Sequence, residues 1–514
     1  MLAFLAFLSS FKRNPIVRPS IMVPSMKSFF VLILAPALLA GCASTGRLAR
    51  PEGAPPPVTL LSVSPYHGLK ATVDSAIVDS LFPPSNLGVR IVSLARNETL
   101  YELNARTLFN PASNEKLFTS ATALSILGEH FAFPTVVSID TLTRTLYVKG
   151  YGDALLATEG MDSLARLVAP LLPGTEPWRV AGDVSYFDDL YWGAGWTWDE
   201  EPAAYGMFLS PLILNNNTIE VKVSPGSAPG SPLDVTISPP TAYVTVENTG
   251  STIGDSVRFP VDISRKWRER SNVITISGQM RQGDHPTSTT LSVWQPERYA
   301  TTVLAERLKA LGVGISEIVI DTVSRSSVEL VRIAHTLDTT VTFMNKVSDN
   351  LTAETLLKTL AAVKRSNPGS SAAGVTVVHE FLNANGIDTT RVAIVDGSGL
   401  SRYDLTSAEA VTRLLTAMYK NREHFDAFYH SLPIAGVDGT LARRMRGTTA
   451  EGNLHAKTGT LSGVSALSGY VRTADGELLA FSVLTQNYAT NSRGYRMVQD
   501  RIGITLSRLK RSEF

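Results

Sequence analysis

The sequence predicts an α/β (α+β) fold in which helices flank a central sheet that is built from both ends of the chain and interrupted by a large, mostly β insertion. Three observations predict it. Alternating, β-branched segments occur near both ends, amphipathic helical patterns lie beside them, and the middle third consists of short strand-like pieces separated by Gly, Pro and Asn. A chain of 514 residues is too long for one hydrophobic core, so we expect two or three domains.

The first strands of the central sheet are predicted at residues 87–94 and 100–103. The former segment alternates and is β-branched, and Asn97-Glu98 provides a turn between the two. A helix is expected after Pro111, because apolar residues recur there at helical spacing until Gly128 ends it.

The stretch that follows changes in character. It has strand-like segments separated by turn residues and only two clear helical patterns, as expected for one or two mostly β inserted domains. The clearest strands are 145–148, 218–223 and 272–276, and the helices are 161–172 and 296–311.

Helices return from about His335, and the chain then ends in a β-meander and a last helix. We expect helices at 341–347, 352–363 (with Thr352 as N-cap), 375–385, 407–419 and 493–508. The strands of the meander are predicted at 465–472 and 478–485, joined by a turn at 474–476.

Residues 1–42 are typical of an export signal that ends at the single cysteine, Cys42. From Met26, a short basic start precedes an apolar run of about a dozen residues, which is too short to span a membrane comfortably. The ending Leu39-Ala40-Gly41-Cys42 resembles a bacterial lipoprotein signal, in which the cysteine is lipidated and becomes the mature N-terminus. The alternative is a lone cysteine that merely follows a signal anchor.

This interpretation predicts an exported protein on the periplasmic side, held to a membrane through a lipidated Cys42. The awkward stretch before the signal suggests that translation starts at Met22 or Met26. Residues 43–58 have no apolar period and are rich in Pro, which is typical of a linker.

Composition argues against several classes of function. The net charge of +1 points to neither nucleic acid nor anionic lipid as a partner. The 8 histidines are scattered without metal-ligand spacing, so we expect no metal. Phosphate loops and dinucleotide motifs are missing from the sequence, and we expect no cofactor.

Three short motifs occur in order along the chain: Ser113-Asn114-Glu115-Lys116, residues 348–350 (Ser-Asp-Asn) and residues 457–459 (Lys-Thr-Gly). Penicillin-binding proteins and class A β-lactamases carry this trio. Each motif alone is weak, and Ser113, Ser348 and Lys457 could be two helix caps and a solvated strand residue. All three in order, with the first opening a helix and the last opening a hairpin, make a strong prediction of a catalytic site.

The chemistry requires these residue types at this spacing. Ser113 and Lys116 lie three apart at a helix start and so share a face. A serine hydroxyl needs a base, and Lys116 can be that base if burial, a nearby cation such as Lys457 and the helix dipole lower its pKa. The N–H of Ser113 can face a developing oxyanion.

The other two motifs complete the expected site. Ser348 can pass a proton to a leaving amine, and Asn350 can hold both Lys116 and a substrate amide. Lys457 and Thr458 offer a cation and a hydroxyl to a terminal carboxylate. Gly459 permits close backbone approach, and the N–H of Thr460 is the expected second oxyanion donor.

On these residues, the chain resembles the class C low-molecular-mass penicillin-binding proteins, the D-Ala-D-Ala carboxypeptidase/endopeptidase family. Further segments that resemble those of this family occur at 182–183, 214–217, 396–402 and 436–441. The resemblance implies a penicilloyl-serine transferase domain with a central antiparallel sheet, and acyl-enzyme chemistry on peptidoglycan stem peptides. It implies Ser113 as nucleophile, Lys116 as base and β-lactams as inhibitors.

The resemblance also sets the domain limits. We expect a transpeptidase-like domain formed by residues 59–135 and 335–514, with one or more β-rich domains inserted at 136–334. That large insertion matches the family and separates the first two motifs far more than in class A β-lactamases.

Two further predictions concern substrate binding. Arg402 follows the 396–401 segment and is either an anion clamp for a substrate carboxylate or part of a structural salt bridge. Asp199 and Glu200, beside Trp196 and Trp198, could meet the amine of a diamino acid.

Two other functions stay open. A serine β-lactamase or esterase would use the same nucleophile with fast deacylation. A catalytically silent wall-binding lipoprotein would use the insertion as an interaction module, although it would have no need to keep all three motifs.

Overall fold

The computed structural model describes residues 60–78, 86–254, 259–365, 367–489 and 491–514. The predicted signal, Cys42 and the predicted linker lie outside these residues.

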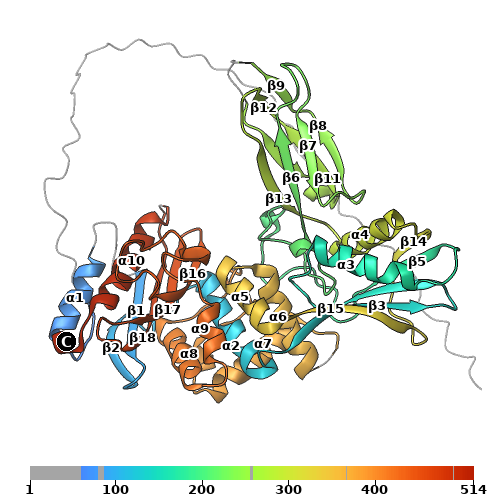
Figure 1. The fold of residues 1–514 in the computed structure, drawn as a ribbon. Coiled ribbons are helices and arrows are strands. Elements are labelled where there is room, and N and C mark those ends of the chain that lie inside the picture. Colours follow the sequence, from blue (N-terminus) through green and yellow to red (C-terminus); the bar gives the residue numbers. More distant parts are fainter. Residues whose placement is uncertain (1–59, 79–85, 255–258, 366, 490) are drawn as a thin grey trace, which may run out of the picture. The chain divides into compact units, whose positions relative to one another are not determined.

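A five-stranded antiparallel sheet from both ends of the chain forms the centre of the part of the molecule that carries the three motifs (Figure 1). Its order is β16-β17-β18-β1-β2. The strands are β1 (Leu87–Ser93), β2 (Glu98–Leu103), β16 (His455–Leu461), β17 (Val464–Arg472) and β18 (Leu478–Gln486). The predicted strands and the turn at 474–476 are confirmed, whereas the first turn spans residues 94–97 and Glu98 already belongs to β2. β16, which carries the third motif, is an edge strand.

Helices cover both faces of this sheet. On one face, α1 (His67–Ile77) and α10 (Arg493–Arg508) bury Leu69, Val73 and Ile502 in a core shared with β1, β17 and β18. The other face packs against a helical layer whose core includes Leu117, Leu357 and Leu414. That layer contains α2 (Glu115–Leu127), α5 (Leu337–Val347), α6 (Asn350–Lys364), α7 (Ser371–Ala384), α8 (Ala408–Lys420) and α9 (Phe425–Ser431).

The fold class predicted from the sequence is therefore confirmed, and so are the predicted helices, with one correction. The N-cap of α6 is Asp349 and not Thr352: the Asp349 carboxylate accepts the Thr352 N–H at 2.7 Å, so the N-cap lies three residues earlier than predicted. An aspartate satisfies the free N–H groups of a first helical turn as well as a threonine does.

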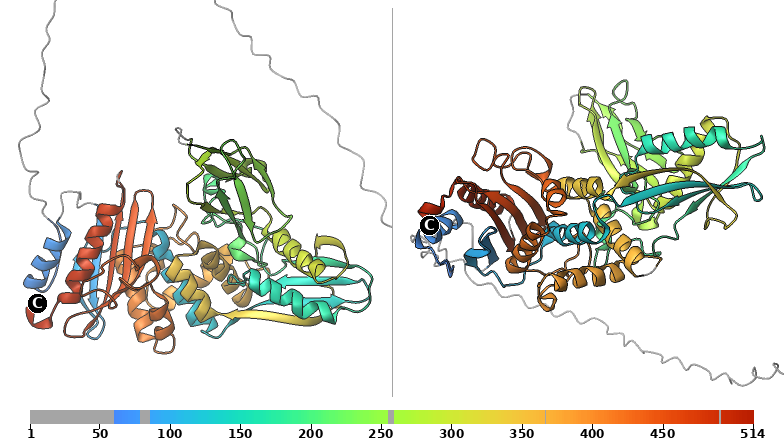
Figure 2. Two further views of the ribbon diagram at one scale, coloured as in Figure 1. Left: turned by 45° about the horizontal axis from the view of Figure 1, so that its top comes forward. Right: turned by 60° about the horizontal axis from the view of Figure 1, so that its bottom comes forward.

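A second five-stranded sheet, of mixed direction, begins the insertion (Figure 2). Its order is β14-β5-β4-β3-β15, and α3 (Thr158–Val168) and α4 (Pro296–Ala310) pack on it. The strands are β3 (Ala132–Asp140), β4 (Thr145–Gly150), β5 (Trp178–Asp183), β14 (Ile315–Ile320) and β15 (Val328–Thr336). The predicted domain limits at 136 and 334 fall inside β3 and β15, which pair with each other, and those limits stay a prediction.

The remaining strands form three small sheets whose apolar side chains join the same core. One has β6 (Thr218–Ser224), β7 (Asp234–Ser238) and β13 (Thr287–Ser292), and another has β8 (Thr245–Asn248), β10 (Asp262–Arg265) and β11 (Val273–Ser277). The third pairs β9 (Ser251–Ile253) with β12 (Gln279–Arg281).

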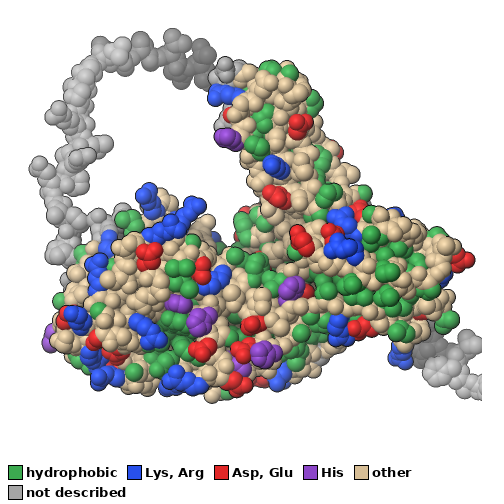
Figure 3. Space-filling model, viewed as in Figure 1, with side chains coloured by type: hydrophobic (Ala, Val, Ile, Leu, Met, Phe, Trp, Pro, Cys, Tyr) green, Lys and Arg blue, Asp and Glu red, His purple; other side chains and the backbone are tan. Residues whose placement is uncertain are grey.

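Charges of both signs are interspersed on the face shown in Figure 3, in keeping with the net charge of +1. Among the described helices, none combines the length and the apolar character that crossing a membrane requires.

Candidate active site

The first motif lies on a short turn that two other segments approach closely, each at a glycine. Ser113 belongs to the 3₁₀ turn Ala112–Asn114 that leads into α2, and Ala112 has a left-handed φ of 45°. A Cβ on Gly399 would stand 1.9 Å from the Ala112 carbonyl oxygen, and one on Gly459 would stand 2.7 Å from that of Pro111. The edge strand and the 396–402 segment can therefore approach the serine from two sides only because both residues lack side chains.

Lys116 is buried directly below this serine. Its Nζ donates to Ser113 Oγ at 3.1 Å, to Asn350 Oδ1 at 2.7 Å and to the Ser398 carbonyl at 2.6 Å. Burial lowers the pKa of Lys116 to about 8, although neighbouring carboxylates such as Asp396 oppose the shift. With this pKa about one tenth of Lys116 is neutral at pH 7, and that fraction gives Ser113 the base that it needs.

The second motif spans the two-residue connection between α5 and α6 and the first residue of α6. Ser348 ends α5 in a left-handed conformation, with φ of 65°. Asp349 caps α6 and also accepts the Asn216 side-chain amide at 2.7 Å. Asn350 reaches Lys116 with its oxygen and donates to the Tyr205 carbonyl at 2.9 Å. This short connection therefore allows Ser348 and Asn350 to line the same cleft.

The third motif brings a second buried lysine to the opposite side. Lys457 Nζ donates to Ser348 Oγ at 2.8 Å and to the Thr458 carbonyl at 2.9 Å. Asn114 donates to the Lys457 carbonyl at 2.9 Å, which ties the first motif to the third. Burial and the Lys116 ammonium hold the pKa of Lys457 well below its usual value.

Three of the four further segments noted in the sequence contact the motifs, among them 396–402 through the Ser398 carbonyl. Asn216 of the 214–217 segment contacts Asp349, as described above. From the 436–441 segment, Asp438 pairs with Lys346 on α5 at 2.8 Å, and Thr440 accepts the Thr458 hydroxyl at 2.8 Å. Asp183 accepts the Val323 N–H inside the insertion instead and does not contact a motif in this way.

Asp396 organises the segment that presents the Ser398 carbonyl to Lys116. Its carboxylate accepts the four successive backbone N–H groups of residues 398–401 at 2.7–3.2 Å. The Trp196 indole adds a further hydrogen bond at 2.8 Å.

Three more carboxyl groups are buried around Asp396. Burial and the Asp396 charge raise the pKa of Glu354 to about 8 and that of Asp404 to about 11. The same causes raise the pKa of Glu115 well above its usual range. The Gly397 N–H donates to Glu354 at 2.6 Å. Sequence reasoning did not single out Glu354 or Asp404, because their proximity arises from packing between distant segments.

A cleft of about 400 Å³ opens over the motifs. Ser113, Ser348, Asn350 and Thr460 line it, together with Arg402, Glu200, Tyr205 and Ser462. Arg402 donates to the Ser462 carbonyl at 2.8 Å, which holds its guanidinium at the rim.

Of the acidic pair predicted for substrate binding, Glu200 lines the cleft and Asp199 does not. Asp199 is exposed in the 3₁₀ turn Trp198–Glu200 and is not among the residues that line the cleft, so its role stays a prediction. Tyr205 and Ser462 were missed because no local pattern marks them.

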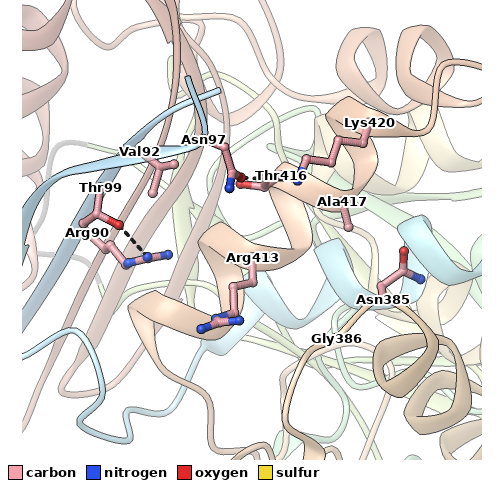
Figure 4. Close-up of a pocket in the computed structure, with 10 residues that line it drawn as sticks. All are labelled: Arg90, Val92, Asn97, Thr99, Asn385, Gly386, Arg413, Thr416, Ala417 and Lys420. Atoms are coloured by element: carbon pink, nitrogen blue, oxygen red, sulfur yellow. Dashed lines mark hydrogen bonds between the residues drawn. The ribbon is translucent and has the colours of Figure 1, made fainter. Parts of the chain in front are cut away.

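Another hollow, of about 370 Å³, lies between β1, β2 and α8 (Figure 4). Its cations already have partners: Arg90 pairs with Glu102, Arg413 with Glu409, and Lys420 contacts Asn97. It contains none of the motif residues, so the motif cleft is the better candidate for chemistry. Across the part of the chain that the structure describes, no cluster of His, Cys, Asp and Glu could hold a metal ion.

The fold and the three meeting motifs define a serine acyl-transfer enzyme of the penicillin-binding type. The model of the D-Ala-D-Ala carboxypeptidase 3 (S13) family matches residues 69–507. A D-alanyl-D-alanine carboxypeptidase of Actinomadura sp. is 32% identical over 88% of this chain and 88% of its own length. The D-alanyl-D-alanine carboxypeptidase DacB of Haemophilus influenzae is 26% identical over 84% of this chain and 92% of its own.

A crystal structure of penicillin-binding protein 4 from Haemophilus influenzae shares the fold, with a TM-score of 0.72. It is 23% identical, and the match covers 86% of this chain and 99% of that chain. This chain belongs to the D-Ala-D-Ala carboxypeptidase 3 (S13) family and is a serine-type D-Ala-D-Ala carboxypeptidase, as the motifs predicted.

Proposed function

We propose that this enzyme cleaves peptidoglycan stem peptides through an ester on Ser113, as a carboxypeptidase/endopeptidase that β-lactams inhibit. One observation carries the assignment of roles: two buried lysines face the two serines from opposite sides, Lys116 at 3.1 Å from Ser113 and Lys457 at 2.8 Å from Ser348. This pairing supplies a base for attack and a proton path for departure within one cleft.

In the acylation step, neutral Lys116 takes the Ser113 proton as Oγ attacks the carbonyl carbon of the penultimate D-Ala. The N–H groups of Ser113 and Thr460 receive the developing oxyanion. Ser348 gives a proton to the nitrogen of the leaving D-Ala as the amide bond breaks, and takes one in turn from Lys457. Water then attacks the ester and passes a proton through Ser348 back to Lys457, while protonated Lys116 returns a proton to Ser113 Oγ as the shortened peptide departs.

Substrate selection follows from the charges around these groups. We assign the terminal carboxylate of the peptide to Lys457 and Thr458, and a second anion contact to Arg402, which lines the cleft. Asp199 and Glu200 are candidates for the amine of a diamino acid. Glu200 has the stronger support of the two because it lines the cleft.

The strained amide of a β-lactam can take the place of the peptide bond and acylate Ser113. The penicillin-binding protein 4 of Haemophilus influenzae has been solved in complex with a β-lactam. In the present chain, the support for the same chemistry is the geometry of the two lysine–serine pairs.

The deciding experiment is the intact mass of the purified protein after incubation with benzylpenicillin, beside Ser113→Ala. We expect a persistent adduct of one penicillin on the unaltered protein alone. Penicillin consumed without an adduct would favour a β-lactamase. Penicillin left untouched would favour a catalytically silent wall-binding lipoprotein.

We also propose that the enzyme acts on the periplasmic side of a membrane, anchored by a lipid on Cys42. The support is the sequence that ends in Leu39-Ala40-Gly41-Cys42. Full-length protein should sediment with bacterial membranes, whereas Cys42→Ser should be released from them. Equal sedimentation of both would contradict a lipid anchor at this cysteine.

A further inference from the structure

Three exposed aromatic side chains lie on or next to segments that line the cleft. Four large aromatic residues stand out as exposed in the described ranges: Trp198 (70%), Tyr205 (53%), Tyr403 (68%) and Phe259 (73%). Tyr205 lines the cleft, Tyr403 follows the rim residue Arg402, and Trp198 lies two residues from the lining residue Glu200. Single exposed aromatics are ordinary, but a cluster beside an active site marks a binding surface.

The Trp198 ring packs in a tilted arrangement against a second tryptophan, Trp267, which comes from the insertion. The two ring centroids lie 5.6 Å apart, with only 32° between the planes, and Trp267 follows β10 in the chain. The Arg268 guanidinium lies 4.8 Å from the Trp267 ring centroid. The pair therefore offers flat apolar faces beside a hydrogen-bond donor. We call these three residues the tryptophan platform.

A second set of rings has the same composition. Trp192 and Trp294 lie 6.3 Å apart at 32°, and the Arg270 guanidinium lies 5.3 Å from the Trp294 ring. An exposed arginine of the 265–270 segment thus lies beside a partly exposed indole twice: Arg268 beside Trp267, and Arg270 beside Trp294.

The segment that carries Trp198 is firmly held between the insertion and the second motif. The buried Arg265 pairs with Glu201 at 2.7 Å, and the Ser292 N–H donates to the Pro202 carbonyl at 3.0 Å. At its other end, the Tyr205 carbonyl accepts the Asn350 amide at 2.9 Å. The platform is thus in a fixed position relative to the catalytic groups, which lowers the entropy cost of binding.

The composition of the platform favours a sugar as its occupant. Indole faces stack on the C–H surface of a pyranose ring, while Arg268 and the adjacent Asp199 can bond hydroxyl and N-acetyl groups. A protein partner would require a larger continuous apolar patch than two rings within charged neighbours. The stem peptide that the cleft takes is joined covalently to a glycan. Since Trp198 is two residues from Glu200, their Cα atoms are at most about 7 Å apart, so sugar and peptide can be bound together.

We propose that the tryptophan platform, Trp198 and Trp267 with Arg268, is a subsite for the glycan strand of peptidoglycan. This inference rests on the proposed function, and it adds the saccharide as a second recognised part of the substrate.

The test compares kcat/KM for a disaccharide-pentapeptide with that for the free pentapeptide, in the unaltered enzyme, Trp198→Ala and Trp267→Ala. We expect each variant to lose about tenfold on the glycan-bearing substrate, as for the loss of one stacking contact of about 1.4 kcal/mol, and to keep its rate on the free peptide. Phe259→Ala is the matched control, because it removes an equally exposed ring away from the cleft and should change neither value. Equal losses on both substrates, or none, would overturn the proposal.

A binding measurement separates this proposal from the proposed function. Peptide-free N-acetylated glycan oligosaccharides should quench the tryptophan fluorescence of Ser113→Ala protein, and the additional change Trp198→Ala should weaken that binding. Glycan binding without penicillin acylation would refute the enzyme mechanism and leave the subsite intact. Acylation without glycan binding would refute the subsite alone.

Discussion

At the scale of single residues, the site depends on two buried lysines that lie close enough for the charge of Lys116 to lower the pKa of Lys457. Lys457 is buried and its pKa is held well below normal, partly by the charge on Lys116, while the pKa of Lys116 falls to about 8. A substrate carboxylate that arrives beside Lys457 would favour its protonated form, which is the form that can both bind the carboxylate and supply Ser348 with a proton.

This arrangement predicts how acylation depends on pH. Only neutral Lys116 can accept the Ser113 proton, so the second-order rate constant for benzylpenicillin acylation should rise about tenfold per pH unit well below pH 8 and level off above it. Stopped-flow kinetics between pH 5.5 and about 9.5 would measure the profile. A flat profile across that range would exclude Lys116 as the base. Lys116→Met, which removes the titrating amine, should acylate slowly at every pH.

At the scale of elements, local pattern was sufficient for most of the fold. Alternation predicted β1, β4, β6, β17 and β18, and helical spacing predicted α2, α4 and α10. The motif order on a helix start and a hairpin predicted that Ser113 and Lys457 would meet, and the edge position of β16 agrees with it.

What the sequence did not reveal depends on contacts between distant segments. The Asp349 carboxylate that caps α6 also accepts a bond from Asn216, which comes from a segment more than a hundred residues earlier and which the sequence does not connect with it. Likewise Glu200, and not its equally acidic neighbour Asp199, faces the cleft. A missed local signal does exist for α1, where Leu69, Val73 and Ile77 recur at a spacing of four.

At the scale of the whole molecule, distant parts of the chain converge on a buried group of acids below the catalytic lysine. Glu115 belongs to α2, Glu354 to α6, and Asp396 and Asp404 to the loop before α8. All four are buried, and three of them have raised pKa values. The three carboxyl groups with raised pKa values are protonated in the folded enzyme at neutral pH, whereas they ionise when the chain unfolds.

The stability of the enzyme should therefore decrease as pH rises. Between the ordinary pKa of a glutamate and about 8, folded Glu354 keeps a proton that the unfolded chain has released, so each pH unit lowers the free energy of unfolding by up to about 1.4 kcal/mol for this group. Glu354→Gln removes that dependence, and its amide oxygen can still accept the Gly397 N–H. The melting temperature of the variant should consequently fall less steeply between pH 5.5 and about 8 than that of the unaltered enzyme. Glu220→Gln, at an exposed glutamate on β6, should leave the slope unchanged. Parallel melting curves for the unaltered enzyme and Glu354→Gln would mean that Glu354 is already ionised in the fold, and that the Gly397 N–H together with Lys116 compensates its burial.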